Sequence, residues 1–419
     1  MKNKNIHQKL SGGQAVVESL TAENVKYVFG LIGSATMELF DALYDSKDIN
    51  FIDVRDERTG AHMADGYARA SGKPGIMIAG QNGPGATNLV TGVAQANAAF
   101  SPLISIAGAI STEHEGKDAF QEIDQQSLFE PITKKTFSVR HTSKISEVLN
   151  QAFTIATTDR CGPVHINFPR DILANNYNFL DFNKHKKKLV TKISEHDLLK
   201  SIEIILESKQ PVIIAGGGIK NTRCHKEVIN LAKHFNIPIV SSAGHGDAIP
   251  SDEILYAGQM GPRGNPVASK LVKEADVIIA LGTRLGFNST FYSYENINKK
   301  ASIIQVDIEP KSLGRYFPIT IGICNDVKTF TIELYEKTIK LNKFPQNNKW
   351  TNKFVKERQN YLKNRDLEAN LNEYPIHPTG LFKILRETLP KNSSLTLDAG
   401  TLCLQATDMF NFLGPRSFF

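Results

Sequence analysis

The chain has 419 residues, enough for two complete α/β domains and part of a third, which excludes a small scaffold held together by disulfides or metals. Hydrophobic residues make up 41% and charged residues 22%, a balance typical of globular proteins and unlike that of disordered or collagen-like chains. The net charge of +6 slightly favours a small anionic substrate but is too dilute over this length to indicate nucleic acid.

The first part of the chain, residues 12–175, alternates strand-like apolar runs with helix-like stretches. Apolar runs at 27–30, 75–79 and 103–107 each end in a glycine-containing loop. This alternation predicts a parallel sheet covered by helices, and sheets of this kind bind ligands in the loops after their strands. The polar, basic run at 177–188 predicts a solvated linker.

A second α/β unit follows, with apolar runs at 211–215, 276–281 and 302–307. Three glycines at 216–218 follow the first of these runs and could open a helix toward a diphosphate. The triplet does not match G-x-G-x-x-G, so it is weak support for a dinucleotide site.

The last part of the chain predicts a polar connector at 342–378 and then a third unit. Only about forty residues remain after the connector, too few for an α/β domain to bury its sheet. We therefore expect a fragment of a three-domain protein, with domains at 1–180, 190–340 and 375–419. The N-terminus is polar and no apolar stretch reaches the ~18 residues of a membrane span, so we expect a cytoplasmic protein with no membrane partner.

The most informative segment runs from residue 54 to 88 and reads VRDERTGAHMADGYARASGKPGIMIAGQNGPGATN. Glu57 begins a helix whose small residues permit close approach of another backbone or a flat ligand. Gly60 and Gly66 lie inside this helix, where each costs about 1 kcal/mol relative to alanine. We expect tight contact at both glycines, with ordinary core packing as the alternative.

This segment resembles the pyrimidine-binding domain of thiamine diphosphate enzymes of the acetohydroxyacid synthase superfamily, where R-x-E, A-D-G-Y-A-R and G-P-G-x-x-N recur. The similarity continues at 118–122, 132–134, 162–164, 169–171, 281–284 and 307–310. It implies an α/β thiamine diphosphate-binding fold. This fold has doubly wound parallel sheets in a pyrimidine-binding domain and a Rossmann-like central domain, and here only the start of a diphosphate-binding domain.

The resemblance implies that Glu57 hydrogen-bonds a pyrimidine nitrogen of the cofactor from a water-poor pocket and promotes the imino tautomer that deprotonates the thiazolium carbon. The alternative is a glutamate that caps its own helix. The implied catalytic residues are Glu57, Gln121 and Lys134. The implied cofactor contacts are Glu57, Gly33, Asn82, Gly83, Pro84, Asn88, Gly400 and Thr401, and the implied substrate contacts are Ser34, Phe120, Gln121 and Lys134.

The resemblance also implies thiamine diphosphate and Mg²⁺ as cofactors. The family holds Mg²⁺ with a G-D-G…N motif that does not occur after residue 394, so we expect no metal ligands in this chain. Family active sites lie between the subunits of a homodimer or homotetramer, and we expect this chain to be inactive alone. Arg284 and residues 258–264 occupy the flavin region of the synthases, but 285–288 (LGFN) depart from their R-F-D-D-R pattern, so bound FAD is doubtful.

Two activities within the superfamily stay open. Residues 33–37 (GSATM) and 81–85 (QNGPG), with 120–122, 167–171, 313–314 and 415–419, resemble sulfoacetaldehyde acetyltransferases, which convert sulfoacetaldehyde and phosphate to acetyl phosphate and sulfite. The stretches 85–92 and 118–122 are equally similar to acetolactate synthases, which decarboxylate pyruvate and join it to a 2-oxo acid. A nucleotide-binding dehydrogenase and a non-catalytic dimerisation partner are the alternatives from other classes.

Overall fold

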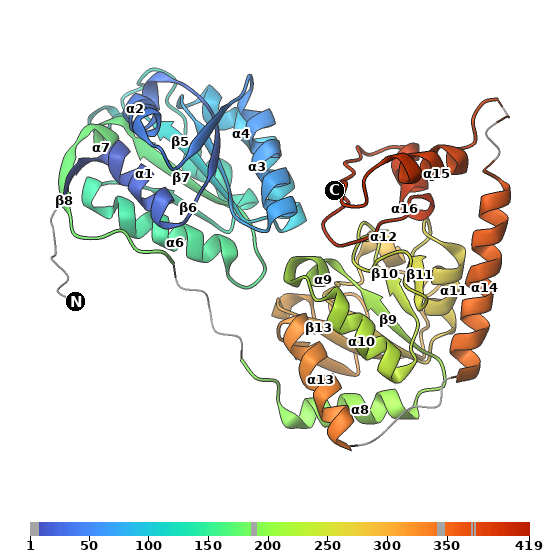
Figure 1. Ribbon diagram of the computed structural model, residues 1–419. Coiled ribbons are helices and arrows are strands. Elements are labelled where there is room, and N and C mark those ends of the chain that lie inside the picture. Colours follow the sequence, from blue (N-terminus) through green and yellow to red (C-terminus); the bar gives the residue numbers. More distant parts are fainter. Residues whose placement is uncertain (1–7, 186–190, 342–347, 370–371, 373) are drawn as a thin grey trace. The chain divides into compact units, whose positions relative to one another are not determined.

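The computed structural model describes residues 8–185, 191–341, 348–369, 372 and 374–419. The chain divides into two compact units, Met1–Leu189 and Val190–Phe419, and each is built on a parallel sheet of its own (Figure 1). In the described part of the chain, no helix is both long enough and apolar enough to cross a membrane.

The first unit has a six-stranded sheet in the order β3-β2-β4-β5-β7-β6, with every neighbouring pair parallel. The chain steps from β2 outward to β3 and then returns to β4 on the other side of β2, so a topological switch point lies between β2 and β4. This doubly wound arrangement confirms the predicted α/β class. The strands are β2 (Tyr27–Leu31), β3 (Asn50–Asp53), β4 (Gly75–Ala79), β5 (Leu103–Ala109), β6 (Lys135–Ser138) and β7 (Val164–Pro169).

Helices cover both faces of this sheet (Figure 1). Along β4, Ile76 and Ile78 face one apolar core while Met77 and Ala79 face the other, as the alternation of side chains along a strand requires. The first core includes side chains of α1, α2 and α6, and the second includes side chains of α3 and α4. The helices are α1 (Gly12–Ala22), α2 (Met37–Asp45), α3 (Glu57–Ser71), α4 (Pro84–Ala99), α5 (Gln125–Phe129), α6 (Ile145–Thr157) and α7 (Arg170–Ala174), with single 3₁₀ turns at Ser34–Thr36, Thr112–His114, Glu130–Ile132 and Thr142–Lys144.

The predicted linker at 177–188 is wrong over its first residues. Strand β8 (Asn176–Phe179) pairs antiparallel with β1 (Gln8–Ser11), and Phe179 is buried in the first core. The partner strand lies more than 160 residues earlier in the chain, so no local pattern signals this pairing. Residues 186–188 lie outside the described residues.

Helices α3 and α4 approach each other closely through small residues. A Cβ added to Gly92 would lie 2.4 Å from the Cβ of Ala61, and one added to Gly60 would lie 2.5 Å from the Met77 sulfur. Gly66 is different, because a Cβ added there meets nothing within 4 Å. Gly60 therefore lies against core side chains, which is the ordinary core packing given as the alternative, and the expected tight contact is wrong at Gly66.

The second unit contains a parallel sheet in the order β11-β10-β9-β12-β13-β14, with a second switch point between β9 and β12. Apolar cores lie on both of its faces. The strands are β9 (Pro211–Ala215), β10 (Ile239–Ser241), β11 (Tyr256–Gln259), β12 (Val277–Leu281), β13 (Ser302–Asp307) and β14 (Ile321–Cys324). The helices packed around them are α8 (Glu195–Glu207), α9 (Gly217–Thr222), α10 (His225–Phe235), α11 (Pro266–Glu274), α12 (Phe287–Thr290) and α13 (Val327–Leu341), with a 3₁₀ turn at Pro310–Ser312.

The connector after this sheet is helical over α14 (Asn348–Leu367). Its Trp350 is buried and donates its indole N–H to the carbonyl of Pro211, 3.0 Å away, at the start of β9. The polar helix expected in the connector is therefore packed against the sheet along one side.

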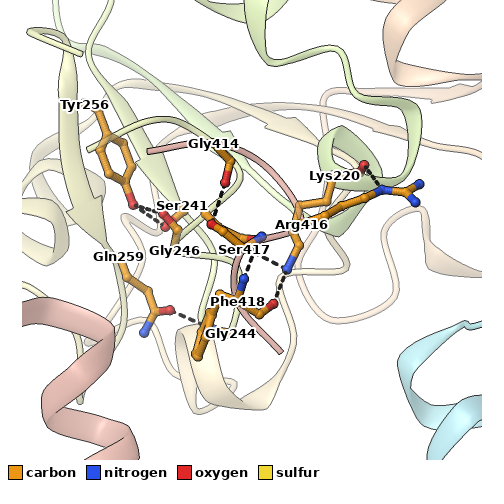
Figure 2. Close-up of polar contacts among 11 residues, drawn as sticks. Lys220, Ser241, Gly244, Gly246, Tyr256, Gln259, Gly414, Arg416, Ser417 and Phe418 are labelled. Atoms are coloured by element: carbon orange, nitrogen blue, oxygen red, sulfur yellow. Dashed lines mark hydrogen bonds and ion pairs between the residues drawn. The ribbon is translucent and has the colours of Figure 1, made fainter. Parts of the chain in front are cut away.

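The end of the chain forms a small unit that contains two helices and one parallel β-bridge. Leu395 and Phe418 form a parallel bridge, and α15 (Pro378–Thr388) and α16 (Thr401–Met409) share an apolar cluster with Phe410, Phe412 and Phe418. Figure 2 shows Lys220 pointing at the main chain of Phe418, to whose carbonyl its Nζ donates over 3.0 Å. Lys220 also forms a buried 2.7 Å ion pair with Asp247, whose other oxygen accepts the N–H groups of Ser417 and Phe418 at 3.0 and 3.1 Å.

Candidate active site

Glu57 is the first residue of α3, and its carboxylate is buried with 6% of the residue exposed. The N-cap of the helix is the preceding residue, Asp56, whose side chain accepts the N–H of Arg58 at 2.8 Å. The capping role considered for Glu57 therefore belongs to Asp56. Since the helix start is already satisfied, the Glu57 carboxylate is left to act elsewhere.

The carboxylate of Glu57 points toward the start of α4. Its Oε2 accepts a hydrogen bond from Asn88 Nδ2 at 2.9 Å, and a Cβ added to Gly85 would lie 3.3 Å from its Oε1. None of the described residues donates a hydrogen bond to Oε1. A carboxylate oxygen beside a glycine, on a largely buried residue and with no donor among the described residues, suits a heteroaromatic nitrogen that brings its own proton.

A second group of polar side chains lies at the carboxyl ends of β2 and β4, beside the switch point. Gln81 follows β4, and its Oε1 accepts both the N–H and the hydroxyl of Ser34, at 3.2 and 2.8 Å. Gln81 Nε2 donates to Gln121 Oε1 at 2.7 Å and to Asn82 Oδ1 at 3.2 Å. The structure therefore brings together Ser34 and Gln121, which were predicted separately, through Gln81, which was not.

The conformation of the turn between β4 and α4 is fixed by contacts with the main chain of the loop at Phe120 and Gln121. Asn82 Nδ2 donates to the carbonyls of Phe120 and Gln121 at 2.9 and 3.0 Å. Gly83 has φ +59°, and an added Cβ would lie 2.5 Å from the Gln121 carbonyl oxygen, so both its conformation and its contact require glycine. Pro84 then begins α4, where its missing N–H costs nothing.

The turn after β2 lies against the turn after β4. A Cβ added to Gly33 would lie 2.5 Å from the Gly80 carbonyl carbon, and the N–H of Ala35 donates to the Gly80 oxygen at 3.0 Å. Phe120 lies on the loop that carries Gln121, and its side chain is 79% exposed. An exposed aromatic ring beside oriented amides is a suitable wall for a small ligand.

A buried polar chain beneath this turn was missed by the sequence analysis. Gln125 Oε1 accepts the N–H of Gly83 at 3.1 Å, and its Nε2 donates to Asn167 Oδ1 at 2.6 Å. His165 bridges Asn167 Oδ1 at 2.9 Å and Ser105 Oγ at 3.0 Å. The signal was available, because His165 and Asn167 are alternate polar residues in a strand that is otherwise apolar.

Lys134 makes its side-chain hydrogen bonds at the end of α6. Its Nζ donates to the carbonyls of Ile155, Thr158 and Arg160, at 2.5, 2.8 and 2.9 Å, at the end of α6. A cation in this position satisfies carbonyls that the helix leaves unpaired. Its role toward a substrate stays a prediction.

Gly400 and Thr401 lie in the second unit, where an extended Gly400 precedes the first residue of α16. The glycines at 216–218 lie in the same unit and have a packing explanation. Cβ atoms added to Gly216 and Gly218 would lie 2.2 Å from the oxygen and 2.8 Å from the Cα of Gly282. This close approach of two backbones accounts for two of the three glycines, and a Cβ added to Gly217 would lie 2.9 Å from the His245 ring.

The chain matches two families of known domains. Residues 10–128 match the thiamine pyrophosphate enzyme N-terminal TPP binding domain, and residues 198–334 match the thiamine pyrophosphate enzyme central domain. Both matches fall on the parallel sheets described above.

Three relatives align with nearly the whole chain. The chain is 36% identical to the probable acetolactate synthase large subunit of Methanocaldococcus jannaschii, over 98% of this chain and 70% of that protein. It is 33% identical to the acetolactate synthase large subunit of Buchnera aphidicola subsp. Schizaphis graminum, over 97% and 71%. It is 32% identical to the sulfoacetaldehyde acetyltransferase of Castellaniella defragrans, over 98% and 71%. The chain therefore belongs to the thiamine pyrophosphate enzyme family.

Proposed function

We propose that the protein transfers an acetyl-level two-carbon unit with thiamine diphosphate, converting sulfoacetaldehyde and phosphate to acetyl phosphate and sulfite. The observation that carries the cofactor assignment is the buried Glu57 carboxylate, with Oε2 held by Asn88 and Oε1 facing Gly85. A carboxyl group in that position holds a proton between itself and a pyrimidine nitrogen, away from competing water.

The described residues fit the pyrimidine half of thiamine diphosphate. Glu57 and Asn88 offer the polar contacts, and the Gly33 and Asn82–Gly83–Pro84 turns offer backbone with little side-chain bulk. Gly400 and Thr401 are our candidates for contacts to the diphosphate. When bound, thiamine diphosphate supplies a nucleophilic thiazolium carbon, and this chain's residues orient it and control its proton at the pyrimidine.

The net reaction needs no external oxidant. The carbon–sulfur bond breaks and sulfite leaves with the bonding pair. The aldehyde carbon loses its hydrogen as a proton and rises to the acyl level, while the methylene carbon gains a proton and becomes a methyl group. A phosphate oxygen forms the new bond to that acyl carbon. In our proposal Ser34, Phe120, Gln121 and Lys134 form the substrate side of the site, where donors offset the charge of the anionic substrate.

A metal and a flavin receive no step in this proposal. In the described part of the chain, no group of three or more His, Cys, Asp or Glu side chains could hold a metal ion. FAD is likewise assigned no role. We further propose a cytoplasmic homodimer or homotetramer with its active sites between subunits.

Acetolactate synthesis is the second candidate. It is favoured by the 36% identity to a probable acetolactate synthase large subunit, against 32% to a sulfoacetaldehyde acetyltransferase. In that reaction pyruvate loses carbon dioxide and the remaining two-carbon unit joins a 2-oxo acid. The same Glu57 would serve both reactions, so the substrate decides between them.

Two assays test this proposal on the purified chain supplied with thiamine diphosphate, Mg²⁺ and the diphosphate-binding domain that we expect it to need. Acetyl phosphate formed from sulfoacetaldehyde and phosphate supports the acetyltransferase, and acetolactate formed from pyruvate alone supports the synthase. Glu57→Gln is expected to lower turnover about 100-fold or more in the active assay, because the carboxyl proton is lost. Glu18→Gln, on the exposed side of α1, is the matched control. Unchanged turnover in Glu57→Gln refutes the role of Glu57.

A further inference from the structure

The orientation of the Gln81 side-chain amide is fixed by a neighbouring group that can act only as a hydrogen-bond donor. The backbone N–H of Ser34 can only donate, and it points at Gln81 Oε1 over 3.2 Å. The Ser34 hydroxyl donates to the same oxygen at 2.8 Å. Turning the Gln81 amide by 180° would place its NH₂ group against the Ser34 N–H, so the oxygen must face Ser34.

This polarity passes from Gln81 to Gln121. With its oxygen toward Ser34, Gln81 directs its NH₂ group at Gln121, and the 2.7 Å contact is made with Oε1 of that residue. Gln121 must therefore turn its own NH₂ group away from Gln81. Among the described residues, none accepts a hydrogen bond from that NH₂ group, and the residue is only half-buried.

The loop that carries Gln121 is held in place independently of its side chain. Its carbonyl accepts from Asn82 Nδ2 at 3.0 Å and lies against Gly83. The residue itself has φ +61°, a conformation that the surrounding contacts must maintain. A fixed backbone and a fixed amide orientation give a donor aimed in one direction before any ligand arrives.

We propose that Gln81 is a positioning residue that presents the Gln121 NH₂ group to an oxyanion of the substrate, a sulfonate or a carboxylate. The inference rests on the proposed function for the identity of the substrate, while the amide arrangement is a property of the protein alone. Hydrogen bonds from amides to charged oxygens are stronger than those to neutral ones. An unpartnered, oriented donor at the switch point therefore selects for an anionic group there.

Anion binding to the full chain, without turnover, tests the proposal. Ethanesulfonate and propionate serve as the sulfonate and carboxylate probes, and the side-chain amide resonances of Gln121, identified by their loss in Gln121→Leu, report binding. We expect saturable shifts of these resonances in the wild-type protein. The probe with the lower Kd identifies which of the two head groups the site prefers.

Two variants of Gln81 separate orientation from charge. Gln81→Met removes the orienting amide and is expected to raise the Kd of the preferred probe about threefold or more. Gln81→Glu keeps the Ser34 contacts but requires Gln121 to turn its oxygen outward, and is expected to raise the Kd about tenfold or more. Gln126→Met and Gln126→Glu carry the same changes at an exposed residue whose side-chain oxygen accepts from Ser138 Oγ, and are expected to change the Kd less than about twofold.

The results overturn the proposal if the wild-type Gln121 resonances do not shift on titration, or if the Gln81 and Gln126 variants bind the probes alike. Thermal unfolding of each variant shows whether it is folded, and the wild-type titration stands even where one variant is not. Turnover of Glu57→Gln is measured alongside. Retained turnover there, with anion binding still dependent on Gln81, refutes the role of Glu57. A wild-type protein that forms no product in either assay refutes the proposed function. Both outcomes leave this inference in place.

Discussion

His165 is a buried side chain whose charge state follows from its partners. Asn167 Oδ1 also accepts from Gln125, so the imidazole Nε2 must carry the proton that reaches this oxygen over 2.9 Å. The other nitrogen then accepts from the Ser105 hydroxyl. The ring is fully buried and stacks on Phe129 at a centroid distance of 3.6 Å. Burial lowers the pKa of His165 to about 3, so the residue is neutral in the folded protein.

This neutrality predicts a pH dependence of stability. An unfolded histidine takes up a proton below about pH 6.5, whereas folded His165 does so only near pH 3. The contribution of neutral His165 to the free energy of unfolding is therefore fully present above pH 6.5. As the pH drops from 6.5 toward 3, this contribution falls by up to about 1.4 kcal/mol per pH unit. His165→Gln should remove this part of the slope in urea unfolding between pH 7.5 and 5.

The control for that experiment is His114→Gln, since His114 is exposed on the same unit. It should leave the slope unchanged. An equal slope in the wild type and in His165→Gln contradicts the assignment of a buried neutral ring.

The residues of the site could be predicted only in part. The pattern around Glu57 is local, so a sequence comparison finds it. Gln81 lies within the same quoted segment, yet its importance depends on Ser34 and Gln121, which are 47 and 40 residues away. Gln125 likewise acts through Asn167, 42 residues away. Partners this distant are set by the order of strands in the sheet, and a single sequence does not state that order.

Among the elements, the α3–α4 pair shows that the effect of a glycine inside a helix depends on what it faces. The helix that begins at Glu57 was expected to permit close approach through its small residues, but spacing alone did not distinguish a glycine that faces another element from one that faces open space. Gly92 faces Ala61, while Gly66 faces nothing within 4 Å. The two positions therefore give opposite results on the same substitution.

Gly92→Ala should lower the free energy of unfolding by about 1–3 kcal/mol, because the added methyl group overlaps Ala61 and separates the helices. Gly66→Ala should raise it by up to about 1 kcal/mol, because alanine favours the helix and meets no neighbour. Thermal and urea unfolding of the two variants measure both effects. Loss of stability in Gly66→Ala would show that this face of α3 is in contact after all.

For the whole molecule, the alternation of apolar runs predicted two parallel sheets, and the structure has both. The pairing of β1 with β8 and the attachment of the last residues to the second unit were not predicted. The first joins distant segments through main-chain hydrogen bonds, and the second joins the side chains of Lys220 and Asp247 to main-chain atoms of Ser417 and Phe418. Main-chain hydrogen bonds do not depend on residue type, so they leave no signature in the sequence.

The attachment of the last residues makes a further prediction. Asp247→Asn breaks the buried ion pair with Lys220 and removes the carboxylate that offsets the ammonium charge. We therefore expect the free energy of opening this segment to fall by about 3–5 kcal/mol. Hydrogen exchange should quicken at 395–397 and 417–419 while β9 and β12 stay protected. Glu227→Gln, which removes a surface pair with Lys328, should change exchange little. Equal hydrogen-exchange rates at these residues in Asp247→Asn and in the wild type would mean that the Lys220–Asp247 ion pair does not hold this segment.

The capping of α3 by Asp56 has a consequence for natural variation. Because position 56 starts the helix, a change at position 57 leaves the polypeptide able to fold and accumulate. Under the proposed role of Glu57, a cell carrying such a change would contain ordinary amounts of an inert protein. Screens that score abundance would overlook the lesion, and only a measurement of metabolic flux would reveal it.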